Sequence, residues 1–202
     1  MLKGRFHPTK ETLIRTVLEL LDSQSVDEVN SDDVLEKSGI SKGSMYHHFE
    51  DFTDLLEHAQ VARFASYVDK SIDMLSSLLV IRDREEFANG IRQVTKFTQS
   101  ISLKPERLYR ATALSRAGVS DRMKANLSAE QSRLSAALAD LYREVINRGW
   151  GNPQVKPETV AVFIQAYTLG MIVDDYVEEP MDHENWLFLI DLVLNRVLFT
   201  GE

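Results

Sequence analysis

One short segment, SKGSMYHHF from position 41, gathers side chains suited to contact with a nucleic acid. Lys42 can pair with a phosphate, and Ser44 can hydrogen-bond a base edge or a phosphate. The rings of Tyr46 and His47 offer apolar contact and hydrogen bonds, and Gly43 lets a helix backbone come close to DNA. These residue types favour a recognition surface over a catalytic centre.

The other residues of this segment have competing interpretations. Met45 and Phe49 are apolar and are expected to face a core. His48 either caps the end of a helix or bonds a phosphate. Adjacent histidines suggest a metal, but neighbours on a helix point apart and no third ligand is near, so no metal is expected. Packing of all four residues from position 46 is the plain alternative; we favour DNA contact for Tyr46 and His47, which fall on the outward face.

A helix-turn-helix is predicted around this segment. One helix covers Lys42–His48 with Ser41 as its N-cap, and a shorter one covers Asp32–Lys37. Gly39 lies in the turn between them and suits a left-handed backbone. In this motif the second helix enters the major groove of DNA, and the first lies across the backbone.

Almost all of the remaining chain has helical periodicity. A first helix is expected at Thr9–Ser23 with Thr9 as its N-cap, and either Asn30 or Ser31 caps the second. We therefore predict an all-α fold of nine helices, with a helix-turn-helix DNA-binding domain at residues 1–52 and a helical effector-binding and dimerisation domain at residues 53–202. The later helices are expected at Thr53–Leu79, Arg84–Ser100, Pro105–Gly118, Asp121–Arg148, Pro157–Tyr176 and Asn185–Phe199.

The turn and recognition segment, SGISKGSMYHHF from position 38, followed by DLL from position 54, resembles the tetracycline-repressor (TetR) family. That family has an Ala-Gly-Val-Ser turn, then a small residue, a tyrosine and a His-Phe pair. The motif covers about residues 9–56, and the nine-helix organisation is similar over the whole chain. The resemblance implies a ligand-responsive transcriptional regulator, usually a repressor, that binds a palindromic operator in double-stranded DNA as a homodimer and is released by a small-molecule effector.

The basic N-terminus adds to the expected DNA contacts. Arg5, Thr9 and Lys10 lie at or before the first helix. They either anchor a phosphate through side chains and helix-terminal amides or form a solvated terminus. The expected DNA-binding residues are Thr9, Lys10, Ser41, Lys42, Gly43, Ser44, Tyr46, His47 and His48.

Two positions depart from the family pattern, and the net charge is unfavourable for DNA. The family usually has a phosphate-contacting lysine three residues after the phenylalanine, where this chain has Phe52. Its usual Ile-Ala pair in the second helix is Val34-Leu35 here, flanked by Asp32 and Asp33. The net charge is −8, although no acidic residue lies between positions 37 and 49. These features motivate the runner-up function, an all-helical small-molecule-binding protein with weakened or lost DNA binding.

The composition and the absence of several motifs argue against other functional classes of protein. The chain has no cysteine, which excludes disulfides, thiolate zinc sites and a cysteine nucleophile and favours a reducing cytoplasm. The best apolar stretch, Val160–Val173, is too short to span a bilayer, so no membrane association is expected. No Gly-rich phosphate loop, HExxH motif or Glu-x-x-His pair is present, so neither an enzyme nor a cofactor is expected. The acidic segment 174–184 is interpreted as a solvated loop rather than a cation site.

The last two predicted helices are apolar around most of their circumference, so each needs two burial partners. One partner is the domain core, and the other is the same helix pair of a second subunit; deep burial in a monomer is the alternative. On the helix from Pro157 the opposite stripe holds Val162, Ala166, Leu169 and Val173. The residues expected at the dimer interface are Val160, Phe163, Ile164, Tyr167, Met171, Leu187, Ile190, Leu194 and Val197.

A dimer would place two recognition helices about 34 Å apart, and an effector could release DNA by changing that spacing. The effector pocket is expected among the middle helices. Aromatic and methionine residues are common in apolar pockets and equally common in cores. An apolar or amphipathic effector is expected because the candidate lining residues are mostly apolar: Phe64, Tyr67, Phe87, Phe97, Tyr109, Met123, Leu127, Phe163 and Tyr167.

Overall fold

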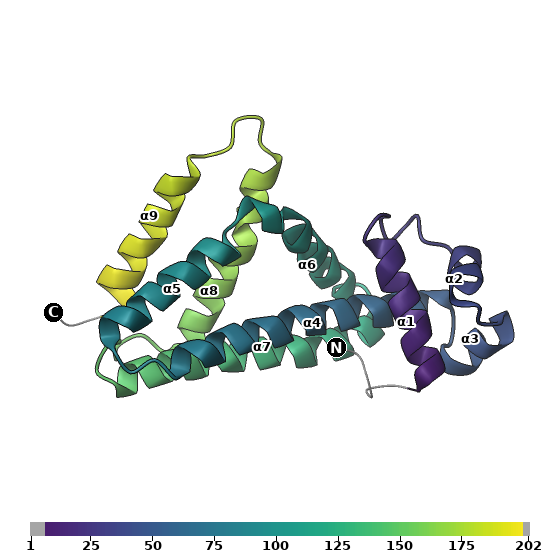
Figure 1. Ribbon diagram of the computed structural model, residues 1–202, viewed down its shortest axis with the longest axis horizontal. Helices are drawn as coiled ribbons and strands as arrows, with labels where there is room; N and C mark the ends of the chain where they lie inside the picture. The colour runs from purple at the N-terminus through teal and green to yellow at the C-terminus, as the bar shows by residue number, and fades with distance from the viewer. Residues whose placement is uncertain (1–6, 200–202) are drawn as a thin grey trace. The chain divides into compact units, whose positions relative to one another are not determined.

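The computed structural model of the protein describes residues 7–199. Over those residues it consists of nine α-helices with short 3-10 and π segments, and no strand is formed (Figure 1), which confirms the predicted all-α fold. Arg5 lies outside the described residues. The helices are α1 Pro8–Leu21, α2 Ser31–Ser38, α3 Lys42–His48, α4 Phe52–Leu79, α5 Arg84–Thr98, α6 Lys104–Ala117, α7 Asp121–Asn147, α8 Pro157–Gly170 and α9 His183–Val193.

Several helix boundaries differ by a few residues from the sequence-based expectation, and two of the differences have clear physical reasons. Thr9 was expected to cap α1, but the N-cap is His7, whose Nδ1 accepts the Thr9 backbone N–H at 3.3 Å. Pro8 occupies the first turn, where its missing N–H costs nothing, so the helix begins before Thr9. The segment expected to continue α8 becomes a 3-10 helix at Met171–Tyr176, a common way for a helix to end.

The described chain forms two compact units. One contains Met1–Tyr67 with Arg116–Leu127, and the other contains Val68–Ser115 with Ser128–Glu202. The division therefore falls inside α4, and the start of α7 belongs with the N-terminal helices. The sequence-based boundary at residue 52 stays a prediction.

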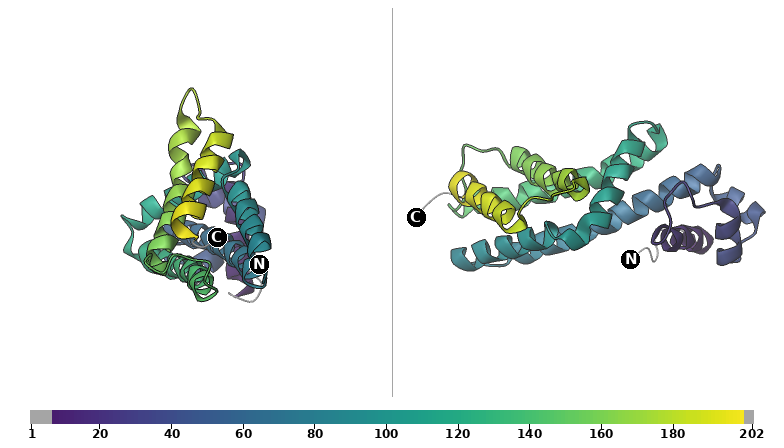
Figure 2. Two further views of the ribbon diagram at one scale, coloured as in Figure 1. Left: turned by 90° about the vertical axis from the view of Figure 1, so that its left-hand side faces the viewer. Right: turned by 90° about the horizontal axis from the view of Figure 1, so that it is seen from above.

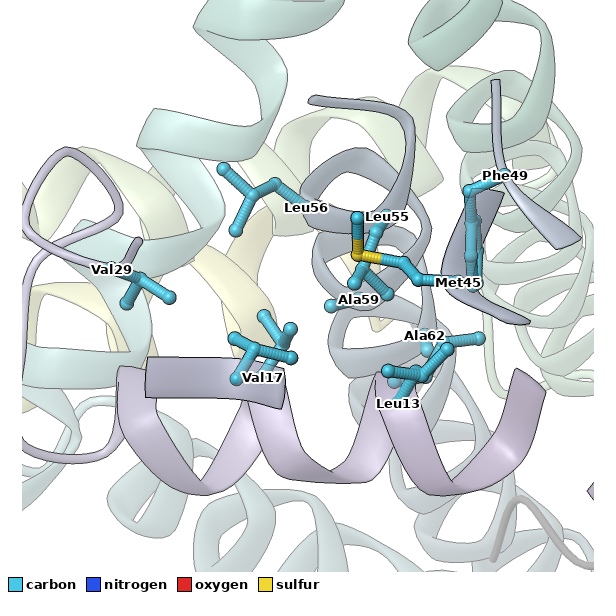
Figure 3. Close-up of a cluster of buried hydrophobic side chains, with 11 residues drawn as sticks. Leu13, Val17, Val29, Met45, Phe49, Leu55, Leu56, Ala59 and Ala62 are labelled. Carbon is cyan, nitrogen blue, oxygen red and sulfur yellow. The ribbon is translucent and has the colours of Figure 1, made fainter. Parts of the chain in front are cut away.

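The first unit is held together by a hydrophobic core among α1, α3 and α4 (Figure 3). Leu13 and Val17 of α1 meet Met45 of α3, and Leu55 and Ala59 of α4 complete the cluster, all of them shielded from solvent. Removing this apolar area from water is the main term that stabilises the arrangement. The core thus fixes the position of α3, which is too short to be stable alone.

The second unit combines helix packing with several long-range polar contacts. Arg133 of α7 bonds Asp69 of α4 at 2.8 Å, and Arg148 donates to the Leu79 carbonyl at 2.7 Å, so α7 is fixed along α4. α8 and α9 run in opposite directions and are joined by the loop after Tyr176 (Figure 2). These contacts organise the part of the chain expected to bind an effector.

Met45 should be a stability residue and its neighbour Tyr46 should not. We expect Met45→Ala to lower the free energy of unfolding by about 2–5 kcal/mol, because it leaves a cavity between α1 and α4. Tyr46→Ala, with the side chain 47% exposed, should change it by less than about 0.5 kcal/mol. Urea unfolding followed by circular dichroism measures both, and equal losses would contradict the placement of α3.

Candidate nucleic-acid interface

The turn before α3 has the geometry that a helix-turn-helix requires. Gly39 has φ 66° and ends α2, with its N–H donating to the Leu35 carbonyl at 3.0 Å. A Cβ at this position would meet no neighbouring atom, so glycine is favoured by the left-handed backbone alone. Ser41 then caps α3 by accepting the Ser44 N–H at 3.2 Å. Both turn expectations and the bounds of α3 are confirmed.

The two faces of α3 differ sharply in burial. Met45 is fully buried and Phe49 is 2% exposed, as their apolar character predicts. Tyr46 and His47 are exposed and point away from that core. Of the other expected contacts, Lys42 and Gly43 are exposed and Ser44 and His48 are half-buried. The outward face therefore presents polar and aromatic groups on a rigid support, and their contact with DNA stays a prediction.

A histidine cluster lies at the C-terminal end of α3. The rings of His48 and His7 stack with centroids 4.8 Å apart, and His47 approaches His48 edge-on at 5.2 Å. Burial, followed by the charges of His7, His47 and Lys10, holds the pKa of His48 below its ordinary value. His48 is therefore a neutral hydrogen-bonding group at neutral pH. No local sequence pattern predicted that His7 would join this cluster.

Lys10 lies at the base of the recognition helix. Its Nζ is 3.1 Å from His58 Nε2 and 4.8 Å from the centroid of the Phe49 ring. Thr9, half-buried, is the second residue of α1. Lys10 is thus beside the end of α3, and phosphate anchoring by both residues stays a prediction.

The two departures from the family pattern have structural explanations. Phe52, at the position of the usual lysine, begins α4 and packs against the hydrophobic core. Asp32 and Asp33 occupy the first turn of α2, where carboxylates favour the positive end of the helix dipole. Asn30 caps this helix and bonds Asp33 through its amide at 2.8 Å. Each of these residues therefore has a role in stabilising the fold.

The nine candidate effector residues are divided between the two units. Phe87 packs in an aromatic cluster with Trp150 and Phe199, whereas Phe97 is exposed. Phe163 and Tyr167 contact each other with ring centroids 5.3 Å apart. Of the others, Tyr109 is half-buried in the second unit, and four belong to the first unit: Phe64, Tyr67, Met123 and Leu127.

The expected dimer stripe needs correction. Val160 is 1% exposed, and three more of its members are buried inside the chain itself, so they cannot meet a partner: Met171, Ile190 and Leu194. The stripe expected on the opposite side of α8 is exposed instead, with Val162 at 64%. Helical spacing predicted two apolar stripes on α8 but could not say which of them would be buried inside the chain. Phe163, Ile164, Tyr167, Leu187 and Val197 remain at least partly exposed.

A groove of about 290 Å³ between α5 and α9 was not predicted from the sequence. Arg92 and Asp191, far apart in the chain, form an ion pair of 3.1 Å across it. No local sequence signal could have paired them. The lining residues are Arg92, Thr95, Lys96, Glu184, Leu187, Phe188, Asp191 and Leu194.

Between residues 7 and 199, no three histidine or acidic side chains lie close enough together to hold a metal ion. Within the same range, no helix is long and apolar enough to cross a membrane.

Comparison with known proteins reveals similarity in structure but not in sequence. No family model matches the sequence, and no curated protein matches it. A candidate TetR-family regulator from Mesorhizobium loti has a TM-score of 0.71 at 14% identity over 95% of this chain and 97% of its own. A candidate transcriptional regulator from Saccharomonospora viridis, solved with choline, scores 0.69 at 14% identity over 95% and 98%. A TetR-family regulator from Agrobacterium tumefaciens scores 0.64 at 16% identity over 94% and 97%. The chain therefore has the fold of the TetR-family transcriptional regulators.

Proposed function

We propose that the protein is a ligand-responsive transcriptional regulator, in the first instance a repressor, that binds a palindromic operator as a homodimer. The observation that carries the proposal is the exposed polar face of α3. This helix is capped by Ser41, and its opposite face is buried in the hydrophobic core. In helix-turn-helix proteins such a face enters the major groove. The similarity in fold to TetR-family regulators supports the same assignment.

Each exposed residue has a distinct expected role. Lys42 pairs with a phosphate, which positions the protein without reading sequence. Tyr46 and His47 face base edges, and Ser44 hydrogen-bonds a base or phosphate. Neutral His48 becomes a better phosphate partner as it gains a proton, so affinity should rise as the pH falls through its lowered pKa.

Substitution of Tyr46 tests the recognition face directly. We expect Tyr46→Ala to weaken binding to the specific operator by about 1–3 kcal/mol, because a base contact is lost. An operator is first selected from random DNA, and affinity is then measured by fluorescence anisotropy at fixed salt.

The control is Phe97→Ala, which removes an exposed ring from α5 in the other unit. It should bind as the wild type does. Unchanged affinity in Tyr46→Ala would place the recognition face elsewhere. Failure of the wild type to select any DNA would favour the runner-up, a small-molecule-binding protein without DNA binding.

A dimer interface on α8 and α9 follows from their exposed apolar side chains. Val162 and Val173 are mainly exposed, as are Phe188 and Leu189 of α9. Large apolar side chains left exposed on a helix pair are candidates for an interaction site. Two-fold pairing of the helices would cover it in a four-helix arrangement. The interface is thus proposed on the opposite stripe from the one the sequence favoured.

Charged substitutions on this stripe should dissociate the dimer without unfolding it. We expect the double variant Val162→Asp, Leu189→Asp to sediment as a monomer, because two carboxylates would be buried in each half of the interface. Val119→Asp, an even more exposed apolar residue in the other unit, is the control and should stay dimeric. A dimeric double variant seen by analytical ultracentrifugation would exclude this face.

The interior of the second unit favours an effector with hydrogen-bonding groups. Gln99 is fully buried, and its Oε1 accepts the indole N–H of Trp186 at 3.0 Å. Because an indole can only donate, the amide orientation is fixed and Nε2 is a donor, with no partner among the described residues. An unused buried donor is costly, and a ligand acceptor would remove that cost.

Gln99 is not among the lining residues of the groove between α5 and α9, and we propose that this groove contributes the remaining contacts of an amphipathic site. Thr95, one turn before Gln99, lines it and hydrogen-bonds the Tyr167 hydroxyl, whose pKa is raised by burial. Lys96 offers a positive charge, while Leu187 and Phe188 offer apolar surface. We infer an effector that combines an apolar body with hydrogen-bond acceptor atoms. Of the apolar and amphipathic effectors expected from the sequence, this favours an amphipathic one.

Trp186 provides a reporter for this site. In a Trp150→Phe background it is the sole tryptophan, and compounds that release the protein from DNA should change its fluorescence. We expect Gln99→Leu to weaken such compounds about tenfold, because a hydrogen bond is lost. The fluorescence of the matched Trp186→Phe protein, which retains Trp150, should not change when the same compounds are added. Release of DNA with constant Trp186 emission would exclude this location.

A further inference from the structure

Four carboxylates border the C-terminal end of the recognition helix. Glu50 and Asp51 are exposed and follow α3 directly, and Asp54 and Glu57 are nearly buried in the first two turns of α4. Exposed negative charge at this point would repel DNA phosphates. If α3 binds DNA, the negative charge of these groups therefore has to be compensated by a nearby positive charge.

All four carboxylates surround the guanidinium of Arg122, in the first turn of α7. Its Nε lies 2.7 Å from Glu57 and 3.3 Å from Asp54, and its Nη1 lies 2.9 Å from Glu50. Asp51 is 3.8 Å from Nη2. Arg122 belongs to the same compact unit as α3 and the start of α4. The rigid fork of an arginine suits several acceptors at once, which a lysine ammonium does not.

The same carboxylates fix the backbone between α3 and α4. The Glu50 N–H donates to Asp54 Oδ2 at 3.0 Å, and the Asp54 N–H donates to Asp51 Oδ1 at 2.7 Å. The bond to Asp51 caps α4, and both bonds set the direction in which the chain leaves α3. Loss of the cation would leave crowded carboxylates at this junction, and their repulsion would act on it directly.

The network continues to α1 through His58. An ammonium can only donate, so the 3.1 Å contact makes His58 Nε2 the acceptor of Lys10. The proton then resides on Nδ1, which donates to the Asp54 backbone carbonyl at 2.9 Å and lies 2.9 Å from Asp54 Oδ1. Asp54 thus receives contacts from α1 through His58 and from α7 through Arg122. The guanidinium pKa of Arg122 is raised, first by its hydrogen bond to Glu57, so the positive charge is permanent.

We propose that Arg122 is a positioning residue for operator binding: it orients the junction after α3 and offsets the charge of Glu50 and Asp51 beside the DNA. The proposal rests on the DNA-binding function proposed above. Arg122 acts through its carboxylate partners and does not itself read DNA. Nothing in the sequence near residue 122 predicts this role, since its partners lie some seventy positions away.

The matched control is Arg133, on the same helix. It pairs with Asp69 and Glu130 in the other unit, so Arg133→Gln removes the same charge from a similar ion pair. We expect Arg122→Gln to bind the selected operator roughly tenfold more weakly and Arg133→Gln to stay within about twofold. Glu50→Gln, added to Arg122→Gln, should restore most of the loss, and Arg122→Lys should be intermediate.

A second measurement does not require DNA. Hydrogen exchange should be several-fold faster at the Glu50 and Asp54 amides in Arg122→Gln than in the wild type or Arg133→Gln, because their acceptors are no longer fixed. Arg122→Lys keeps the charge and serves as the folded reference if Arg122→Gln melts early.

Equal operator affinities of Arg122→Gln and Arg133→Gln, or unchanged exchange at both amides, would overturn the proposal. So would a loss of affinity that Glu50→Gln does not reverse. If the wild type binds no DNA at all, the proposed function fails, and the exchange measurement still decides whether Arg122 positions the junction.

Discussion

The burial of one face of a seven-residue helix is the interaction on which the rest of the structure depends. A helix as short as α3 has no stability of its own in water. It persists because Met45 and Phe49 are held between α1 and α4. That anchoring leaves Tyr46 and His47 outside, at fixed positions. Hydrophobic burial on one side is thus the condition for recognition on the other.

The hydrophobic core fixes the position of α3, and polar interactions then determine where the helix begins and how the chain leaves it. Gly39 and Ser41 determine where α3 starts, and the junction around Arg122 determines how the chain continues after it. Each of these is a local device, yet Arg122 comes from a distant part of the chain. The N-terminal unit is therefore completed by residues 116–127, which a division by sequence alone assigns elsewhere.

The sequence predicted what depends on local pattern. Helical spacing, glycine and cap residues gave nine helices and the recognition segment, and α3 has the predicted bounds. It failed where tertiary contacts decide. Periodicity found two apolar stripes on α8, but only packing shows that Val160 is covered and Val162 is open. In the same way, the stacking of His7 on His48 and the groove between α5 and α9 arise from residues that have no sequence relationship.

Gly43 has a consequence for how the protein could change its target. Unlike Gly39 it has no positive φ, and a Cβ built on it meets no neighbouring atom. The fold therefore places no demand on glycine at this position, which lies on the exposed side of α3. New side chains can be installed there at little cost to the scaffold beyond the DNA contact itself. Position 43 is accordingly a natural point of entry for evolving or engineering regulators that choose different sites in a genome.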